Sequence, residues 1–261
     1  MLIDTHAHLD HDPFDNDRQL VIERSLAAGV TEIVVVGTTL AGSQRAVKLA
    51  SEQACLYATV GIHPNHAAEA APADWEEICQ LAAHPRCVAL GETGLDRYWD
   101  DTPFAQQQDY FDRHIQLSQQ TGLPLVIHTR ESLAETLEML TAARQRGPVS
   151  GVLHSYTGDY ASALMAIELG LYISFAGMVT FKKNTALREV ARQIPTERIL
   201  VETDSPYLAP EPVRGKRNEP ANTRYTAECL ARERGTSLAE FAALTTENAR
   251  RLFRLGVAKN R

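Results

Sequence analysis

The sequence predicts an α/β fold of the (β/α)8 TIM barrel type. Short apolar runs rich in β-branched residues alternate with amphipathic segments throughout its 261 residues. Strand-like runs that are each followed by a helical segment indicate a parallel sheet. Eight such units, with no shift in composition between them, favour one closed barrel over an open doubly wound sheet. We therefore expect a single domain that spans residues 1–261.

The expected elements follow one another in strict order. Strands are predicted at 2–8, 32–37, 56–62, 87–92, 124–128, 149–154, 172–176 and 199–204. Helices are predicted at 17–28, 43–53, 74–83, 103–121, 131–146, 159–169 and 185–193, with two more near 222–234 and 237–254. Residues typical of helix starts are Ser43 and the pair Thr236 and Ser237. Residues typical of helix ends are Gly29, Gly122, Gly147 and Gly170.

Side chains that can bind metals follow five of these runs, at the point where each strand should end. They are His6, His8, Glu92, His128, His154 and Asp204. The carboxyl ends of all strands of a barrel form one rim, and active sites lie there. His6 and His8 are two residues apart in a strand and therefore point to the same side. We expect all six side chains to meet at one place.

Each of these residues has an ordinary explanation when it is taken alone. The His-x-His pair can be incidental, Glu92 can form a salt bridge at the rim, and His128 or His154 can be a core histidine. Their shared position favours a metal site. Six ligands exceed the three that a catalytic zinc takes from a protein, which indicates two adjacent metals with a bridging carboxylate. Mixed nitrogen and oxygen ligands suit Zn, Mn, Fe or Co, and Mg where oxygen dominates.

Composition limits the partners. A formal net charge of −7 disfavours wrapping of long duplex nucleic acid, but leaves open a small anionic substrate or a strand end held by a metal. No apolar stretch approaches the ~18 residues of a membrane span, and no signal peptide precedes the first strand-like run. The four cysteines are scattered, which is typical of reduced thiols. We expect a cytoplasmic protein, and a monomer.

Other residues of the rim predict where a substrate binds. His63 and Arg130 follow the third and fifth runs and are candidates for contacts to a phosphate or leaving group, although loop packing and a surface ion pair explain them equally well. The last two loops carry basic residues that favour phosphate binding. These residues are Lys182, Lys183, Arg214, Lys216 and Arg217, and Asn218 stands beside them as a further hydrogen-bonding candidate.

Aromatic residues and the remaining histidines allow weaker predictions. Tyr156, Phe175 and Phe181 are candidates for stacking a base, with packing inside the barrel as the ordinary alternative. The residues expected at the surface are His11, His66, His84 and His114.

The chain resembles the TatD family of metal-dependent hydrolases in several motifs, in order, over almost its whole length. Residues 2–10 (LIDTHAHLD), 91–96 (GETGLD) and 194–206 (IPTERILVETDSP) resemble three blocks of that family. Shorter similar segments are 61–64 (GIHP), 127–130 (IHTR), 153–158 (LHSYTG) and 214–220 (RGKRNEP).

This resemblance implies an amidohydrolase-like barrel with two divalent metals, Zn, Mn or Mg, that hydrolyses phosphodiesters. Members are described as deoxyribonucleases, often 3′→5′ exonucleases, and the implied partner is the end of a single-stranded DNA or RNA or another phosphate-bearing molecule. The implied ligands are the six residues at the strand ends, with Glu92 as the bridge. Asp204 is our candidate for accepting a proton from the attacking water, and Glu202 for orienting a ligand, with a salt bridge as its alternative.

Two other functions are considered. Some relatives are described as removing D-amino acids from tRNA, and the same metal centre would serve such an ester or amide hydrolase. A metal-stabilised scaffold is less consistent with the sequence, because structural zinc sites are closed and usually rich in cysteine.

Overall fold

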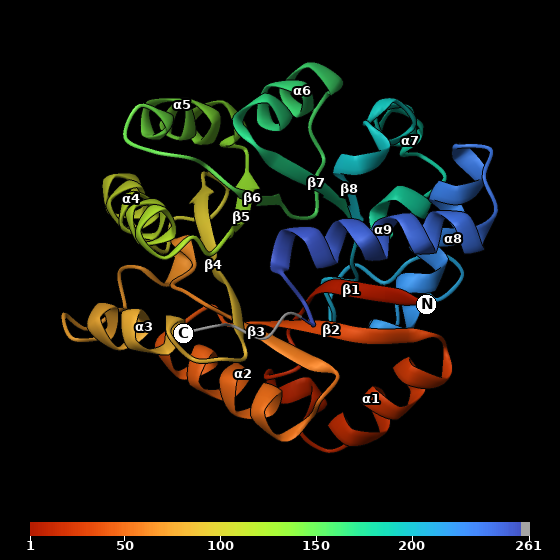
Figure 1. The fold of residues 1–261 in the computed structure, drawn as a ribbon, viewed down its shortest axis with the longest axis horizontal. Helices are drawn as coiled ribbons and strands as arrows, with labels where there is room; N and C mark the ends of the chain where they lie inside the picture. The colour runs from red at the N-terminus through yellow and green to blue at the C-terminus, as the bar shows by residue number, and fades with distance from the viewer. Residues whose placement is uncertain (257–261) are drawn as a thin grey trace.

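The parallel sheet holds all its strands in chain order. In the computed structural model, which describes residues 1–256, the sheet runs β1-β2-β3-β4-β5-β6-β7-β8 with parallel pairing throughout (Figure 1). The strands are β1 (Leu2–Ala7), β2 (Val30–Val36), β3 (Leu56–Val60), β4 (Cys87–Asp96), β5 (Leu125–Arg130), β6 (Gly151–Leu153), β7 (Leu171–Phe175) and β8 (Ile199–Val201). The predicted barrel of eight parallel strands is confirmed. The last five residues of the predicted domain, 257–261, lie outside the described residues.

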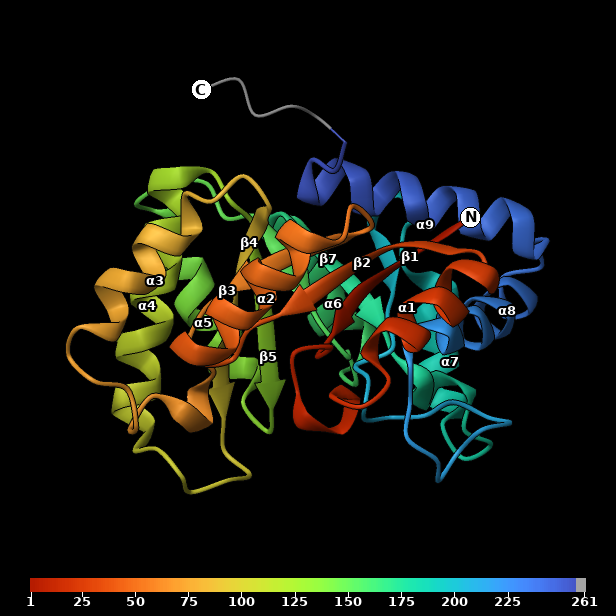
Figure 2. The same cartoon turned by 90° about the horizontal axis from the view of Figure 1, so that it is seen from below.

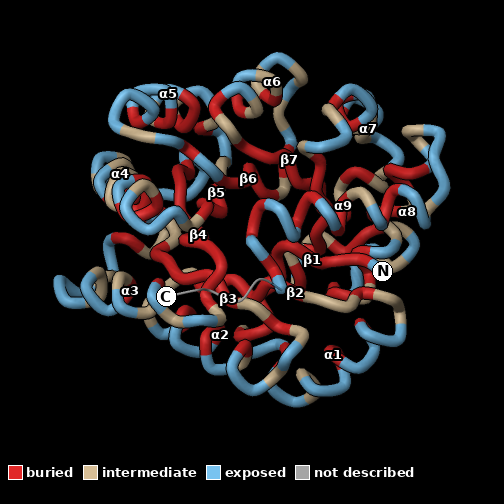
Figure 3. Tube along the Cα trace, in the orientation of Figure 1, coloured by how far each residue is buried: buried red, intermediate tan, exposed pale blue. Residues whose placement is uncertain are grey.

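Helices surround the sheet and separate the strands. They are α1 (Arg18–Ala27), α2 (Leu40–Glu52), α3 (Asp74–Ala82), α4 (Phe104–Thr121), α5 (Leu133–Arg144), α6 (Tyr160–Leu169), α7 (Thr185–Gln193), α8 (Thr223–Glu233) and α9 (Leu238–Phe253). The strands form the buried centre and the helices expose their outer faces (Figure 3). None of the helices in residues 1–256 combines the length and apolar composition needed to cross a membrane.

Helix α9 closes one end of the barrel and leaves the other end for the site. Figure 2 shows α9 along one end, and the loops that follow β4 and β8 at the opposite end. The side chains inside the barrel pack directly on α9 and the residues after it. This cluster consists of Ile3, Val34, Val36, Val88, Ala89, Val126, Val152, Tyr172, Leu200, Ala249, Leu252, Phe253 and Leu255. The carboxyl ends of the strands therefore form the open rim.

The seam between β8 and β1 is closed by residues beyond the end of β8. The Asp4 carboxylate accepts hydrogen bonds from the Thr203 amide at 2.9 Å and from the Thr203 hydroxyl at 2.6 Å. The amide of Asp204 donates to the carbonyl of His6 at 2.8 Å, and the amide of His8 donates to the carbonyl of Ser205 at 2.8 Å. These contacts fix Asp204 beside His6 and His8, at the end of β1.

Strand β4 carries an irregularity where Glu92 enters the barrel. Leu90 pairs with Leu125 and Thr93 with Ile127, so β4 has one residue more than β5 between these pairs. Such a bulge redirects the side chains next to it. Gly91 and Gly94 have φ of 132° and 138°, and a Cβ on either would collide with a carbonyl of β5. Glycine is therefore required on both sides of Glu92.

Most predicted helix boundaries agree with the structure within a few residues. Ser237 caps α9 in a capping box with Glu240, as predicted for a helix start. Gly122 and Gly170 end α4 and α6 in the left-handed conformation. The prediction that Ser43 starts a helix was wrong, because Thr39 caps α2 and Ser43 lies inside it. Ser43 instead binds the backbone of Gly61 from within the first turns.

Candidate metal centre

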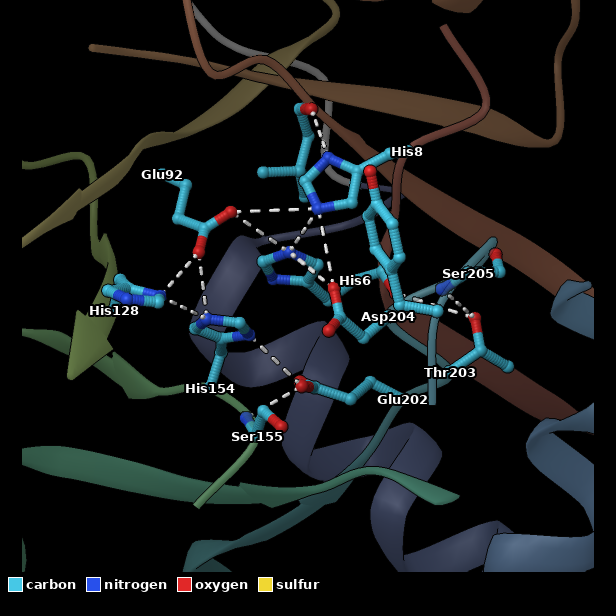
Figure 4. A network of polar contacts seen from close by, with 12 residues as sticks. His6, His8, Glu92, His128, His154, Ser155, Glu202, Thr203, Asp204 and Ser205 are labelled. Atoms are coloured by element: carbon cyan, nitrogen blue, oxygen red, sulfur yellow. Dashed lines mark hydrogen bonds and ion pairs between the residues drawn. The ribbon is translucent and has the colours of Figure 1, made fainter. Parts of the chain in front are cut away.

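Two histidines at the end of β1, His6 within the strand and His8 just after it, form one half of the centre. Figure 4 shows the rings of His6 and His8 side by side, with their Nε2 atoms 3.1 Å apart. The Nδ1 atom of His8 lies 3.1 Å from the carbonyl oxygen of Val36, which can only accept a hydrogen bond. Neutral His8 therefore carries its proton on Nδ1 and directs the lone pair of Nε2 into the centre.

Glu92 lies between two sets of histidines. Its Oε2 is 3.3 Å from His6 Nε2 and 3.6 Å from His8 Nε2. Its Oε1 is 3.0 Å from His128 Nδ1 and 2.8 Å from His154 Nε2. Each oxygen of one carboxylate thus faces its own pair of imidazoles (Figure 4). Glu92 therefore offers an oxygen donor to both pairs of histidines, which suits a divalent-metal site.

Asp204 joins the half of the centre formed by β1. Its Oδ1 lies 3.3 Å from His8 Nε2 and 3.6 Å from His6 Nε2. The sequence predicted Asp204 as the last residue of strand eight, but β8 ends at Val201 and Asp204 lies beyond it with φ of 57°. Aspartate tolerates this left-handed conformation better than most residues. The seam contacts to β1 hold it there.

Two further carboxylates support the histidines of the other half. Asp96 Oδ2 lies 2.9 Å from His128 Nε2, and Glu202 Oε1 lies 3.3 Å from His154 Nδ1. A carboxylate on the second ring nitrogen fixes the orientation of a ligating histidine and makes it a stronger donor. The sequence analysis left Glu202 open and assigned no role to Asp96. The sequence feature that could have identified Asp96 is its place within GETGLD, four residues after Glu92.

The carboxylates favour positive charge in this centre. Burial alone would lower the pKa of His8, but Asp204 and Glu92 raise it to about 9. Burial likewise opposes charge on His154, yet Glu92 and Glu202 raise its pKa well above the usual range. Burial would raise the pKa of Glu92, whereas His154, His63 and His6 hold it well below its usual range. The field that favours protons here also favours a divalent cation, which displaces them on binding.

The residues fit a divalent metal. Three ligand groups of the centre, His6 with His8 and Glu92, His63 with Glu92 and His128, and His6 with His154 and Glu202, each place their donor atoms within 4.8 Å of one another. Their nitrogen and oxygen donors are those that Zn, Mn and Fe prefer. His6 Nδ1 is buried without a hydrogen-bond partner among the described residues. Buried polar atoms without a partner are uncommon in folded proteins.

Of the predicted substrate contacts, His63 reaches the centre and Arg130 lies at its rim. His63 Nε2 is 3.5 Å from Glu92 Oε1, and its ring packs edge-on against His128 with centroids 4.5 Å apart. His63 Nδ1 accepts a hydrogen bond from the amide of Asn65, so Nε2 carries the proton. Arg130 is exposed at the end of β5 and lies over the ring of Tyr98, 3.8 Å from its centroid.

Arg217 and Asn218 are bound within the protein. The guanidinium of Arg217 contacts both carboxylate oxygens of Asp17 at 2.8 and 2.7 Å, close to the start of α1. Asn218 is fully buried and donates to the carbonyls of Thr203 and Tyr207 at 3.0 and 2.7 Å. Both residues therefore hold the loop after β8 in place.

Two aromatic residues follow the ordinary alternative of packing in the barrel, and one prediction about a histidine was wrong. Tyr156 and Phe175 are only 1% and 0% exposed, so they pack in the core and cannot stack a base. His114 was expected at the surface, but it is fully buried in α4. Phe181 remains partly exposed, beneath the guanidinium of Arg214.

A parallel barrel with buried imidazoles and carboxylates at its carboxyl rim is the architecture of a metal-dependent hydrolase. The profile of the family described as TatD related DNase matches residues 3–254. The chain belongs to the TatD family and is a metal-dependent hydrolase. It is 41% identical over 257 residues to the uncharacterized metal-dependent hydrolase YabD of Bacillus subtilis, covering 98% of this chain and 100% of that protein.

Two further relatives bear on function and fold. The chain is 34% identical over 257 residues to the 3′-5′ ssDNA/RNA exonuclease TatD of Salmonella typhimurium, covering 97% of this chain and 98% of the relative. The crystal structure of YJJV, a TatD homologue from Escherichia coli, superimposes with a TM-score of 0.92 at 28% identity. That superposition covers 97% of this chain and 98% of the other.

Proposed function

We propose that this protein is a two-metal phosphodiesterase that removes nucleotides from the ends of single-stranded DNA or RNA. The observation that carries the proposal is Glu92, whose two oxygens each face a separate pair of histidines. The relative in Salmonella typhimurium named as a 3′-5′ ssDNA/RNA exonuclease supports the substrate class and the polarity. We therefore propose 3′→5′ hydrolysis.

The ligands divide into two sets that share one carboxylate. His6, His8, Asp204 and Glu92 Oε2 would hold one ion. His128, His154 and Glu92 Oε1 would hold the second. Two divalent ions of Zn, Mn or Mg would supply electrophilic stabilisation of a phosphate and acidify water near neutral pH.

We propose Asp204 as the group that accepts the proton of the attacking water. Its side chain is 14% exposed, whereas that of Glu92 is 5% exposed, so Asp204 is the more accessible of the two carboxylates. Burial raises its pKa, but His8, His6 and His154 outweigh burial and lower the pKa below its usual value. Asp204 is therefore ionised at neutral pH and can act as a general base.

The rim residues supply contacts to the strand. His63 offers its Nε2 proton beside Glu92, where a phosphate oxygen or a leaving oxygen would lie. Arg130 offers positive charge at the end of β5. We propose that Arg217 and Asn218 act indirectly, because they shape the loop after β8.

The test is digestion of single-stranded oligonucleotides labelled at either end, with each metal supplied in turn. Glu92→Gln removes the shared charge and should lower the rate by at least about 100-fold, because both metal sets lose a ligand. The matched control is Glu228→Gln, which changes an exposed carboxylate of α8 that pairs with Arg224. The control should digest like the wild type.

The outcomes separate the proposal from its alternative. Stepwise shortening from the 3′ end by wild type and control, lost in Glu92→Gln, supports the proposal. Intact oligonucleotides together with metal-dependent release of the amino acid from a D-aminoacyl-tRNA would replace it with carbonyl chemistry at the same centre. Shortening that Glu92→Gln leaves unchanged would assign the activity to a contaminant and contradict the proposal.

A further inference from the structure

Two large aromatic side chains are exposed in the loop after β4. Tyr98 is 50% exposed and Trp99 is 48% exposed. Their rings meet edge to face with centroids 4.8 Å apart, and the guanidinium of Arg130 lies over both, at 3.8 Å and 5.7 Å. Figure 2 shows this loop at the open end of the barrel, across the rim from the loop after β8. We call Tyr98, Trp99 and Arg130 the aromatic platform.

One carboxylate connects the aromatic platform to the metal centre. Asp96 Oδ1 accepts hydrogen bonds from the amides of Tyr98 and Trp99 at 2.8 and 3.1 Å. Its other oxygen, Oδ2, lies 2.9 Å from Nε2 of His128, a proposed metal ligand. Asp96 itself is 1% exposed. The backbone of the platform is therefore fixed relative to the atoms that would hold the metal.

Contacts of the neighbouring residue Arg97 also fix the aromatic platform in place. Arg97 binds Glu135 of α5 at 2.6 Å and lies over the ring of Phe104, 3.7 Å from its centroid. The amide of Arg97 donates to the carbonyl of Arg130 at 2.9 Å, which joins the backbones of the two loops. A preorganised aromatic surface loses little conformational entropy when a flat ligand binds.

The charges around the platform favour a base over a phosphate on its aromatic face. Among the described residues, the guanidinium of Arg130 contacts the rings of Tyr98 and Trp99 and forms no ion pair with a carboxylate within 4.0 Å, which leaves its charge for a substrate. Asp100 and Asp101 follow Trp99 directly and would repel a phosphate on their side. Exposed aromatic rings with an arginine beside them are typical of surfaces that stack the bases of single strands.

We propose that the aromatic platform stacks a nucleobase of the single-stranded substrate and thereby positions the strand end over the metal centre. This inference rests on the proposed nuclease function and names the residues that recognise the substrate as a nucleic acid. Because the two rings stand at 88° to each other, the base stacks on the face of Trp99, Tyr98 supports that ring edge to face, and Arg130 contacts the phosphate of the same nucleotide. Such stacking does not depend on base identity, because every base presents a π-face.

The first test compares two oligonucleotides that differ only in abasic sites at the terminal nucleotides. Wild type should cleave the normal strand about ten-fold more efficiently than the abasic strand, through a lower KM, because stacking contributes binding. Trp99→Ala should reduce this ratio to near one, and Trp99→Phe should restore most of it. Trp75→Phe, a change in the partly buried tryptophan of α3, is the matched control and should keep the wild-type ratio.

The second test observes the contact directly. Trp75 and Trp99 are the two tryptophans of the chain, so Trp75→Phe leaves Trp99 as its single tryptophan. The metal-loaded variant is titrated with an oligonucleotide that resists cleavage because both ends carry phosphorothioate linkages. Stacking should quench the fluorescence of Trp99 to saturation, whereas the abasic strand should leave it unchanged.

The results distinguish the platform from the function on which it rests. Equal cleavage of normal and abasic strands by wild type, with no quenching of Trp99, would overturn the platform and leave the nuclease proposal standing. No cleavage of any oligonucleotide, with bis(4-nitrophenyl) phosphate still hydrolysed, would overturn the nuclease proposal and the platform together. A ratio that falls in Trp99→Ala and recovers in Trp99→Phe would support both.

Discussion

At the scale of single residues, histidines that are similarly buried have different roles in this protein. His114 is as buried as the histidines of the centre, but both of its nitrogens have ordinary partners. Its Nδ1 donates to the carbonyl of Tyr110 at 2.7 Å, and its Nε2 accepts from the amide of Ile62 at 3.2 Å. Neutral imidazole is the form that satisfies both bonds. His114 is therefore a structural link between α4 and the segment after β3.

This arrangement predicts that acid destabilises the protein through His114. Burial lowers its pKa from 6.5 to about 4. Below pH 6.5 the unfolded chain takes up a proton that the folded protein does not, so stability falls with pH until about pH 4, by about 3 kcal/mol in total. Urea unfolding at a series of pH values should give a shallower dependence for His114→Asn than for wild type. Identical slopes would contradict the assignment.

The failure to predict the burial of His114 has a physical cause. Histidine is intermediate in its tendency to be buried, so the residue type alone does not predict a position in the interior. However, Tyr110, Phe111 and Ser118 stand at helical spacing from His114 and are buried with it. The buried face of α4 thus predicts the burial of His114, whereas the residue type does not.

At the scale of elements, β4 shows how local backbone conformation places a ligand. The sequence predicted a strand that ends at Glu92, but β4 continues to Asp96 and pairs with β5 up to Arg130. Gly94 reads as a strand breaker in a simple pattern, yet here it permits close approach to the carbonyl of His128. The continuation matters because it delivers Asp96 to the second nitrogen of His128.

The close approach predicts unequal effects of two glycine substitutions. Gly94→Ala combines a φ of 138° with a collision against the His128 carbonyl, and should destabilise the protein by about 3 kcal/mol or more or prevent soluble expression. Gly122→Ala has a φ of 71° and open space for the new Cβ, and should lower the free energy of unfolding by only about 1 kcal/mol. Denaturant unfolding compares them. A Gly94→Ala protein as stable as Gly122→Ala would show that β4 can relax.

At the scale of the whole molecule, the order of elements carries most of what the sequence predicts. The alternation of strands and helices predicts the barrel, and the barrel predicts that residues far apart in sequence meet at one rim. His6 and Asp204 lie within 3.6 Å although 198 positions separate them. The sequence did not predict the aromatic platform, because Tyr98 and Trp99 gain significance only from the way the loop is held to the site.

The alternation of strands and helices also does not predict how the barrel closes. The seam contacts between Asp4 and Thr203, and the position of α9 across the opposite end, depend on packing between the two ends of the chain. No local periodicity encodes which of two barrel ends a terminal helix covers. That choice decides the architecture, because it leaves the carboxyl rim with its metal-capable residues open to a substrate.

We propose that this rim binds two divalent ions with Glu92 between them. The most direct measurement is the metal content of the protein by mass spectrometry after loading and dialysis, for wild type, Glu92→Gln and the control Glu228→Gln. We expect two ions per chain in wild type and control, and at most one in Glu92→Gln, because the shared carboxylate serves both sets. A wild-type protein that retains no more metal than Glu92→Gln would contradict the account.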